Sequence, residues 1–168
     1  MRIASISKPI TSLIAAKLYD ENKFDLDQSI DFYLPHLPSF KCNDKIVKIT
    51  SRQLISHTSG IRHYEKKNEI NKEKSESGSD TSLKEFYIKD NFRTTKDAME
   101  LFINDELLSE PGTEFFYTTH GFTLLSAVLE KISGRSSFSK LLLDLFQVLD
   151  MKDTYLDQND PLIKNRSK

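Results

Sequence analysis

The sequence predicts one mainly α-helical domain with little β-structure, and three observations lead to this prediction. Apolar residues recur at the spacing of an amphipathic helix in several segments, most clearly over residues 122–132 and 138–146. Only residues 45–49 have the composition and length of a strand. The chain has 168 residues, of which 38% are apolar, and this is enough for one packed domain, assigned to residues 1–168.

The first predicted helix begins beside Ser5. Ile10, Leu13 and Leu18 repeat at helical spacing. Pro9 has no backbone N–H and is tolerated only in the first turn of a helix. We therefore expect Ser5 at or next to the N-terminus of this helix.

The next segments predict loops around one short strand and one short helix. The prolines within residues 33–38 disfavour helix at the residues before them. Residues 45–49 are the predicted strand. Thr50 and Gln53 follow with the spacing of a capping box, so a short helix should begin there and end near residues 57–60.

Residues 65–85 have a different composition, rich in Lys, Glu, Ser and Asn and poor in bulky apolar residues. Such a segment cannot bury a core, so we predict a charged, mobile surface insertion within the domain. After it, Thr95 is expected to cap a helix that carries Leu101 and Phe102, and the turn at residues 111–112 (Pro-Gly) should end that region.

Two amphipathic helices are predicted for the last part of the chain. The first carries the apolar stripe of residues 122–132 and has Gly134 in the position that commonly ends a helix. The second covers roughly residues 137–149. A loop before the first of these helices contains Tyr117.

Composition excludes several classes of function. The formal net charge is −1, so the chain lacks the clustered positive charge of a general nucleic-acid binder, and no nucleic-acid partner is expected. No segment has the length of apolar sequence that a transmembrane helix or an export signal requires. Cys42 is the single cysteine, expected as a free thiol in a loop, and the four histidines have irregular spacing. We therefore expect no metal and no cofactor.

Ser5 and Lys8 form the pattern S-x-x-K, which puts a hydroxyl and an amine on one face of a helix. The pattern alone carries little weight, because Ser137 and Lys140 form a second copy that solvent exposure explains. The first copy differs by its place at a predicted helix N-terminus, whose partial positive charge favours the anionic form of a serine. Lys8 would need burial, this dipole or a neighbouring group to act as a base, and Tyr117 could provide a phenol for that purpose.

Four segments together resemble one protein family. They are residues 5–11 (SISKPIT), 53–60 (QLISHTSG), 111–112 (PG) and 117–122 (YTTHGF). In order and spacing they are similar to the class C β-lactamases and the penicillin-binding-protein-related serine hydrolases. Residues 61–65 and 149–151 most resemble a mitochondrial branch of that family found in animals. This resemblance implies a mitochondrial location, although the chain itself contains no transit peptide.

The resemblance implies a role for each matching residue. Ser5 would be the acylated nucleophile, Lys8 its proton acceptor or the group that tunes it, and Tyr117 the relay of the proton to the leaving group. Thr119 stands where the family usually has an asparagine that contacts substrate, and its hydroxyl cannot present an amide to a substrate carbonyl. The implied reaction is therefore hydrolysis of a peptide or other amide bond, through an acyl-serine intermediate and without a cofactor, rather than β-lactam turnover.

The resemblance also implies parts that this sequence does not contain. The relatives have strands before the nucleophile and after the helical region, and a late Lys- or His-led triplet. We therefore expect a mainly α fragment of a β-lactamase/transpeptidase-like α/β fold, made of the nucleophile helix and the helical middle region, with most of the sheet missing. The missing triplet's strand would supply one oxyanion-hole donor, and losing such a donor costs about 3 to 4 kcal/mol of transition-state stabilisation. Weak or no catalysis by this chain is the expectation.

Two alternatives remain open at the level of sequence. The chain could be a non-catalytic interaction or assembly module, in which the apolar face of the first helix binds a partner or a second copy, forming a homo-oligomer. It could also be a truncated gene product whose missing sequence carries the rest of the domain.

Overall fold

The computed structural model describes residues 1–64, 85, 88 and 92–157. A 3-10 turn, η1, opens the chain and two strands form an antiparallel hairpin with Phe40 opposite Val47. The elements in order are η1 (Ala4–Ile6), α1 (Ser7–Asp20), α2 (Ile30–Tyr33), β1 (Phe40–Cys42), β2 (Lys45–Val47), α3 (Ser51–Ile55), α4 (Thr95–Met99), α5 (Thr119–Ser133) and α6 (Phe138–Val148). The prediction of a mainly helical fragment with little sheet is confirmed.

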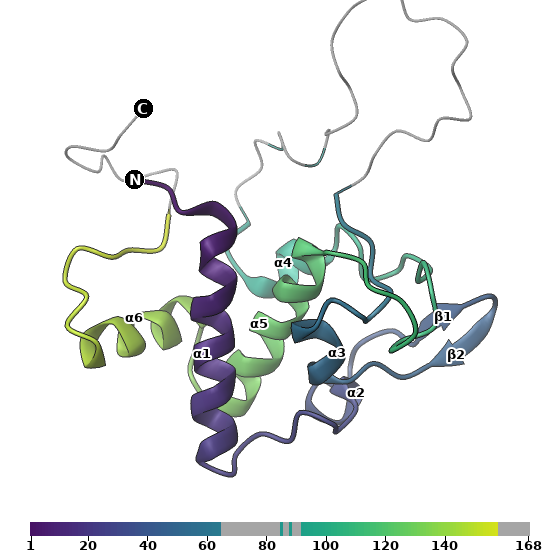
Figure 1. Ribbon diagram of the computed structural model, residues 1–168, viewed down its shortest axis with the longest axis horizontal. Helices are drawn as coiled ribbons and strands as arrows, with labels where there is room; N and C mark the ends of the chain where they lie inside the picture. The colour runs from purple at the N-terminus through teal and green to yellow at the C-terminus, as the bar shows by residue number, and fades with distance from the viewer. Residues whose placement is uncertain (65–84, 86–87, 89–91, 158–168) are drawn as a thin grey trace, which may run out of the picture.

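Helix α5 is the centre of the core. It packs against α1, α2, α3, α4 and α6, and Leu124, Leu125, Val128 and Leu129 on it are completely buried. Figure 1 shows α1 lying alongside α5, with α6 and the β1–β2 hairpin at opposite ends of the molecule. The apolar stripe that predicted this helix is therefore its buried face.

Part of the apolar face of α1 is covered within the chain. Ile14, Ala15 and Leu18 are buried, and α1 packs on α5, whereas Leu13 is 46% exposed. The alternative of an assembly module, which used this face as its binding surface, stays a prediction.

Capping residues in the local sequence determine where α3 and α4 begin and where α5 ends. Thr50 and Gln53 form the predicted capping box at the start of α3. Gly134 ends α5 in the left-handed conformation, with φ of 67°. The N-cap of α4 is Thr94, which forms a capping box with Asp97, so the assignment of this role to Thr95 is wrong by one residue.

One further expectation needs correction and one lies mostly outside the described residues. Cys42 is in strand β1 and only 3% exposed, so its placement in a loop is wrong. The predicted insertion at residues 65–85 falls almost entirely outside the described residues. The exception is Glu85, whose side chain is 9% exposed and paired with Arg62. No helix in the described part of the chain is long and apolar enough to cross a membrane.

Candidate active site

Ser5 lies in the η1 turn that leads directly into α1. Ala4 before it has φ of 44°, a left-handed conformation that residues with a side chain seldom adopt. The hydroxyl of Ser7 donates to the carbonyl of Ala4 at 2.7 Å and holds this turn. The chain thereby presents Ser5, which is exposed, at the N-terminal end of α1.

Lys8 and Tyr117 both reach the hydroxyl of Ser5. Lys8 Nζ donates to Ser5 Oγ at 3.2 Å, and the Tyr117 hydroxyl donates to the same atom at 2.6 Å. Lys8 lies one helical turn after Ser5, whereas Tyr117 comes from the loop before α5. The two meet because α1 and α5 lie side by side and begin on the same side of the molecule (Figure 1).

Thr119 is the fourth residue that the sequence assigned to the site, and it contacts Lys8. Lys8 Nζ donates to Thr119 Oγ1 at 3.2 Å. The amine of Lys8 also lies over the ring of Tyr117, 4.7 Å from its centre, and 5.8 Å from the ring centre of Phe122. With only 9% of Lys8 exposed, its ammonium group is fixed between two hydroxyls and two aromatic faces.

The positive charge of Lys8 changes the acidity of its neighbours. The hydrogen-bonding interaction with Lys8, followed by that with Ser5, holds the pKa of Tyr117 below its usual value of 10.0, against a smaller opposing effect of burial. Burial, and then the charge of Lys8, lower the pKa of His57 below 6.5. The site therefore makes the phenol of Tyr117 easier to deprotonate and the imidazole of His57 harder to protonate.

Two histidines that the sequence analysis left without a site role lie beside Tyr117. The ring centre of His57 is 4.6 Å from that of Tyr117, and the ring of His63 approaches it edge-on at 5.4 Å. The sequence placed His57 in a turn near the site but gave no signal that either ring would contact Tyr117. The irregular spacing of the histidines in the sequence was evidence only against a metal site.

The turn containing His57 also carries the chain that leads to Tyr117. The carbonyl of Gly60 accepts from Leu108 N–H at 2.8 Å, that of Thr58 from Gly112 N–H at 2.7 Å, and that of His57 from Phe116 N–H at 2.8 Å. These bonds bind the segment before α5 to residues 57–60 along its length. They account for the defined position of a tyrosine that lies in a loop.

A buried cation anchors the same turn from the other side. Arg62 donates to both carboxylate oxygens of Glu85, at 2.8 and 2.9 Å, and to Asp105 at 2.6 Å. The backbone carbonyl of Arg62 accepts from the Thr118 hydroxyl at 2.7 Å. Glu85 is also within 3.1 Å of His120 Nε2, on the first turn of α5. This network fixes the entry to α5 next to Tyr117.

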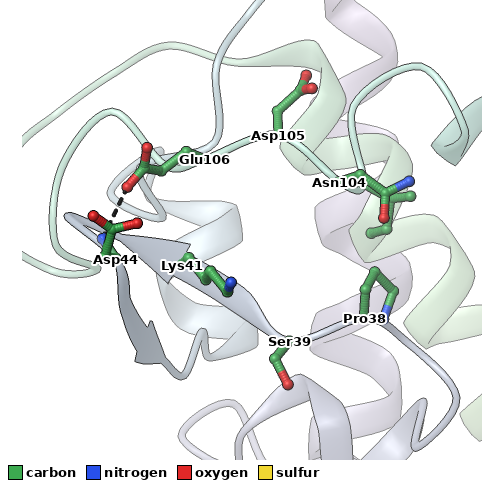
Figure 2. Close-up of a pocket in the computed structure, with 8 residues that line it drawn as sticks. Pro38, Ser39, Lys41, Asp44, Asn104, Asp105 and Glu106 are labelled. Atoms are coloured by element: carbon green, nitrogen blue, oxygen red, sulfur yellow. Dashed lines mark hydrogen bonds between the residues drawn. The ribbon is translucent and has the colours of Figure 1, made fainter.

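A separate surface hollow of about 270 Å³ lies between β1 and the segment after α4, and none of the four predicted site residues lines it (Figure 2). Its walls carry Lys41 and the carboxylates of Asp44, Asp105 and Glu106. The one hydrogen bond drawn there runs from the Asp44 N–H to Glu106 Oε1 at 3.1 Å. Figure 2 thus shows a polar hollow lined by side chains from residues 38–44 and 103–106.

The fold defines the class first: the chain shares the fold of the β-lactamases and penicillin-binding proteins. More specifically, it belongs to the Beta-lactamase family, whose model matches residues 1–167. The resemblance to class C β-lactamases and penicillin-binding proteins is therefore confirmed.

Three relatives illustrate the similarity. The human mitochondrial serine β-lactamase-like protein LACTB is 33% identical over all of this chain and 39% of its own length. A D-stereospecific amidohydrolase from Streptomyces has a TM-score of 0.68 at 26% identity, covering 90% of this chain and 43% of that one. A penicillin-binding protein from Bacillus halodurans has a TM-score of 0.70 at 24% identity, covering 94% of this chain and 44% of that one. The chain thus spans less than half the length of each.

The half-buried imidazole of His57 and the buried imidazole of His120 predict that the fold loses stability in mild acid. Burial lowers the pKa of both His57 and His120 below the value of 6.5 that holds in the unfolded chain. The unfolded state therefore binds more protons as the pH falls below 6.5, and the free energy of unfolding decreases from there down to the folded-state pKa values. Urea unfolding at several pH values between about pH 5 and pH 8 measures this slope.

Three carboxyl groups with a lowered pKa, those of Glu21, Asp27 and Asp31, lose their charge only below this pH range. The pKa of Glu21, for example, is lowered from 4.5 to about 2 by Lys17 and Lys23, so its effect begins only at lower pH. A free energy of unfolding that stays constant down to about pH 5 would contradict the prediction.

Proposed function

We propose that this chain is part of a serine hydrolase that cleaves amide or peptide bonds through an acyl-Ser5 intermediate. One observation carries the proposal: the Lys8 amine at 3.2 Å and the Tyr117 phenol at 2.6 Å both contact the hydroxyl of Ser5. A serine needs such a group to remove its proton before it can attack a carbonyl.

The proposed reaction assigns one task to each residue. Tyr117, as the phenolate that Lys8 stabilises, takes the proton of Ser5 while Ser5 Oγ forms a bond to the substrate carbonyl carbon. Tyr117 then delivers that proton to the leaving nitrogen as the carbon–nitrogen bond breaks. Water hydrolyses the resulting ester and restores Ser5. Lys8 remains charged and stabilises the phenolate, and Thr119 holds Lys8 and lines the substrate side of the site.

Two considerations support amides and peptides as substrates. Thr119 replaces the asparagine usual in the family, so no side-chain amide stands at this position to hold a β-lactam carbonyl. The Streptomyces relative, with a similar fold, is an amidohydrolase.

A fluorophosphonate probe tests the proposal. The folded chain is incubated with the probe and the modified residue is found by peptide mapping. We expect the label on Ser5, its loss in Ser5→Ala, and its retention in Ser137→Ala, which removes the serine of the other S-x-x-K pair. A folded chain that takes no label, or takes it on another serine, would overturn the assignment.

Thr119→Val is expected to slow labelling about tenfold, because the ammonium of Lys8 loses one acceptor and its position relative to Ser5 and Tyr117 loosens. Thr119→Ser keeps a hydroxyl there and should label at close to the wild-type rate. The measurement is the rate of Ser5 labelling in wild type, Thr119→Val and Thr119→Ser at one probe concentration. Equal rates for the valine and serine variants would show that Lys8 does not depend on this contact.

We also propose a mitochondrial location for the protein that contains this chain. The support is that three mammalian relatives, which are 32–33% identical, are named as mitochondrial proteins. Antibodies against this chain, used on fractionated cells, test the proposal. Recovery of the antigen outside the mitochondrial fraction would refute it.

A further inference from the structure

Tyr117 lies in a loop, so its position must be set by groups outside its own segment. It is immediately followed by the N-terminus of α5, where the first backbone N–H groups have no partner within the helix. Thr118 N–H donates to His57 Nδ1 at 3.1 Å, and Thr119 N–H donates to His63 Nδ1 at 3.3 Å. Two imidazoles therefore accept the two N–H groups that directly follow Tyr117.

His57 is itself rigidly held. Its backbone is left-handed, with φ of 59°, and its carbonyl accepts from Phe116 N–H at 2.8 Å. Its ring centre lies 4.6 Å from that of Tyr117 and 5.2 Å from that of Phe122. The residue thus contacts Tyr117 by its ring and binds the chain on both sides of it, at residues 116 and 118.

The hydrogen bond to Thr118 requires a particular chemical state of His57. Nδ1 can accept only when it carries no proton, so the ring must be neutral with its proton on Nε2. The charged or titratable groups that face the ring are Lys8, from α1, and Tyr117, from the loop. Burial and the positive charge of Lys8 both disfavour protonation of the imidazole.

We propose that His57 is a positioning residue for the acylation of Ser5: its neutral Nδ1 holds Thr118, and its ring supports Tyr117, so that the phenol stays over the hydroxyl of Ser5. This inference rests on the proposed function. His57 touches neither Ser5 nor any reacting atom in this scheme, and acts only through Tyr117. Loss of the acceptor would leave the Thr118 N–H unpaired and free the phenol to move away from Ser5.

The test compares His57→Ala with His57→Asn. Asparagine tolerates the left-handed backbone and offers a carbonyl oxygen close to the place of Nδ1, but it does not titrate. We expect His57→Ala to label at Ser5 about 10- to 100-fold more slowly than wild type, and His57→Asn to recover most of the rate. His36→Ala serves as the matched control and should label normally.

A second readout does not depend on labelling. In the wild-type chain, the amide proton shift of Thr118 in NMR spectra should titrate with the protonation of His57. In His57→Asn this titration should disappear while the amide stays hydrogen-bonded. If Ser5 takes no label in the wild type, the proposed function fails, and the Thr118 titration still tests the contact. Equal labelling rates at Ser5 in His57→Ala and wild type would refute the positioning role of His57. An amide proton shift of Thr118 that does not change with pH in the wild type would refute it as well.

Discussion

We expect Tyr117→Phe to slow the acylation of Ser5 by about 100- to 10,000-fold, the range that a positioned acid or base contributes. The phenol is 2.6 Å from Ser5 Oγ, and its pKa is lowered chiefly by Lys8, so removing it removes the proposed base. Lys8 alone would remain near the hydroxyl. The measurement is the rate of fluorophosphonate labelling at Ser5, followed by mass spectrometry.

Controls separate this effect from damage to the fold. Phenylalanine keeps the ring that contacts His57 and lies under Lys8, so the free energy of unfolding should hardly change. Tyr155, which is 62% exposed, provides a matched substitution, and Tyr155→Phe should label at the wild-type rate. A Tyr117→Phe protein that labels as fast as wild type would remove Tyr117 from the mechanism.

We expect Gly60→Ala to destabilise the fold by about 3 kcal/mol, from left-handed strain together with overpacking. Gly60 has φ of 76°, and a Cβ there would lie 2.3 Å from the carbonyl oxygen of Ser109. The neighbour is backbone and cannot rotate away. Since the Gly60 carbonyl accepts from Leu108 N–H, the strain would also pull on the chain that leads to Tyr117. Urea unfolding of variant and wild type measures the difference.

Gly134→Ala separates the two causes. Gly134 also has a positive φ, of 67°, but a Cβ there would meet no atom within 4 Å. Only the conformational strain remains, and we expect a loss of about 1 kcal/mol. If the two variants lost equal stability, close approach to Ser109 would not be the reason that residue 60 is glycine.

The elements that the sequence predicted well are those with signals inside a single segment. The capping box at Thr50 and the apolar stripe of α5 each depend on residues within one or two turns. The error at Cys42 has another origin. Strand β1 is only three residues long and is stabilised by pairing with β2, so Cys42 has no local pattern that distinguishes strand from loop. The N-cap at Thr94 did have a local signal, because Asp97 stands three residues later and forms the capping box with Thr94, and this signal was overlooked.

The same distinction between local signals and long-range contacts applies to the residues of the candidate site. The proximity of Ser5 and Lys8 follows from their spacing along one helix. Tyr117 was expected beside them only through the resemblance to a family, since the sequence separates it from Ser5 by more than a hundred residues. The roles of His57 and His63 as acceptors for Thr118 and Thr119 had no signal in the sequence at all.

The sequence by itself determined the longer helices α1, α5 and α6, the capping box at Thr50 and the pairing of Ser5 with Lys8, because these depend on the periodicity and hydrogen bonding of neighbouring residues. Only the tertiary structure decided where the Tyr117 phenol lies and which imidazoles hold it. That position results from packing α1 on α5 and from bonds between residues 57–62 and the chain before α5. Such contacts join residues far apart in the chain, and no short-range pattern encodes their distances.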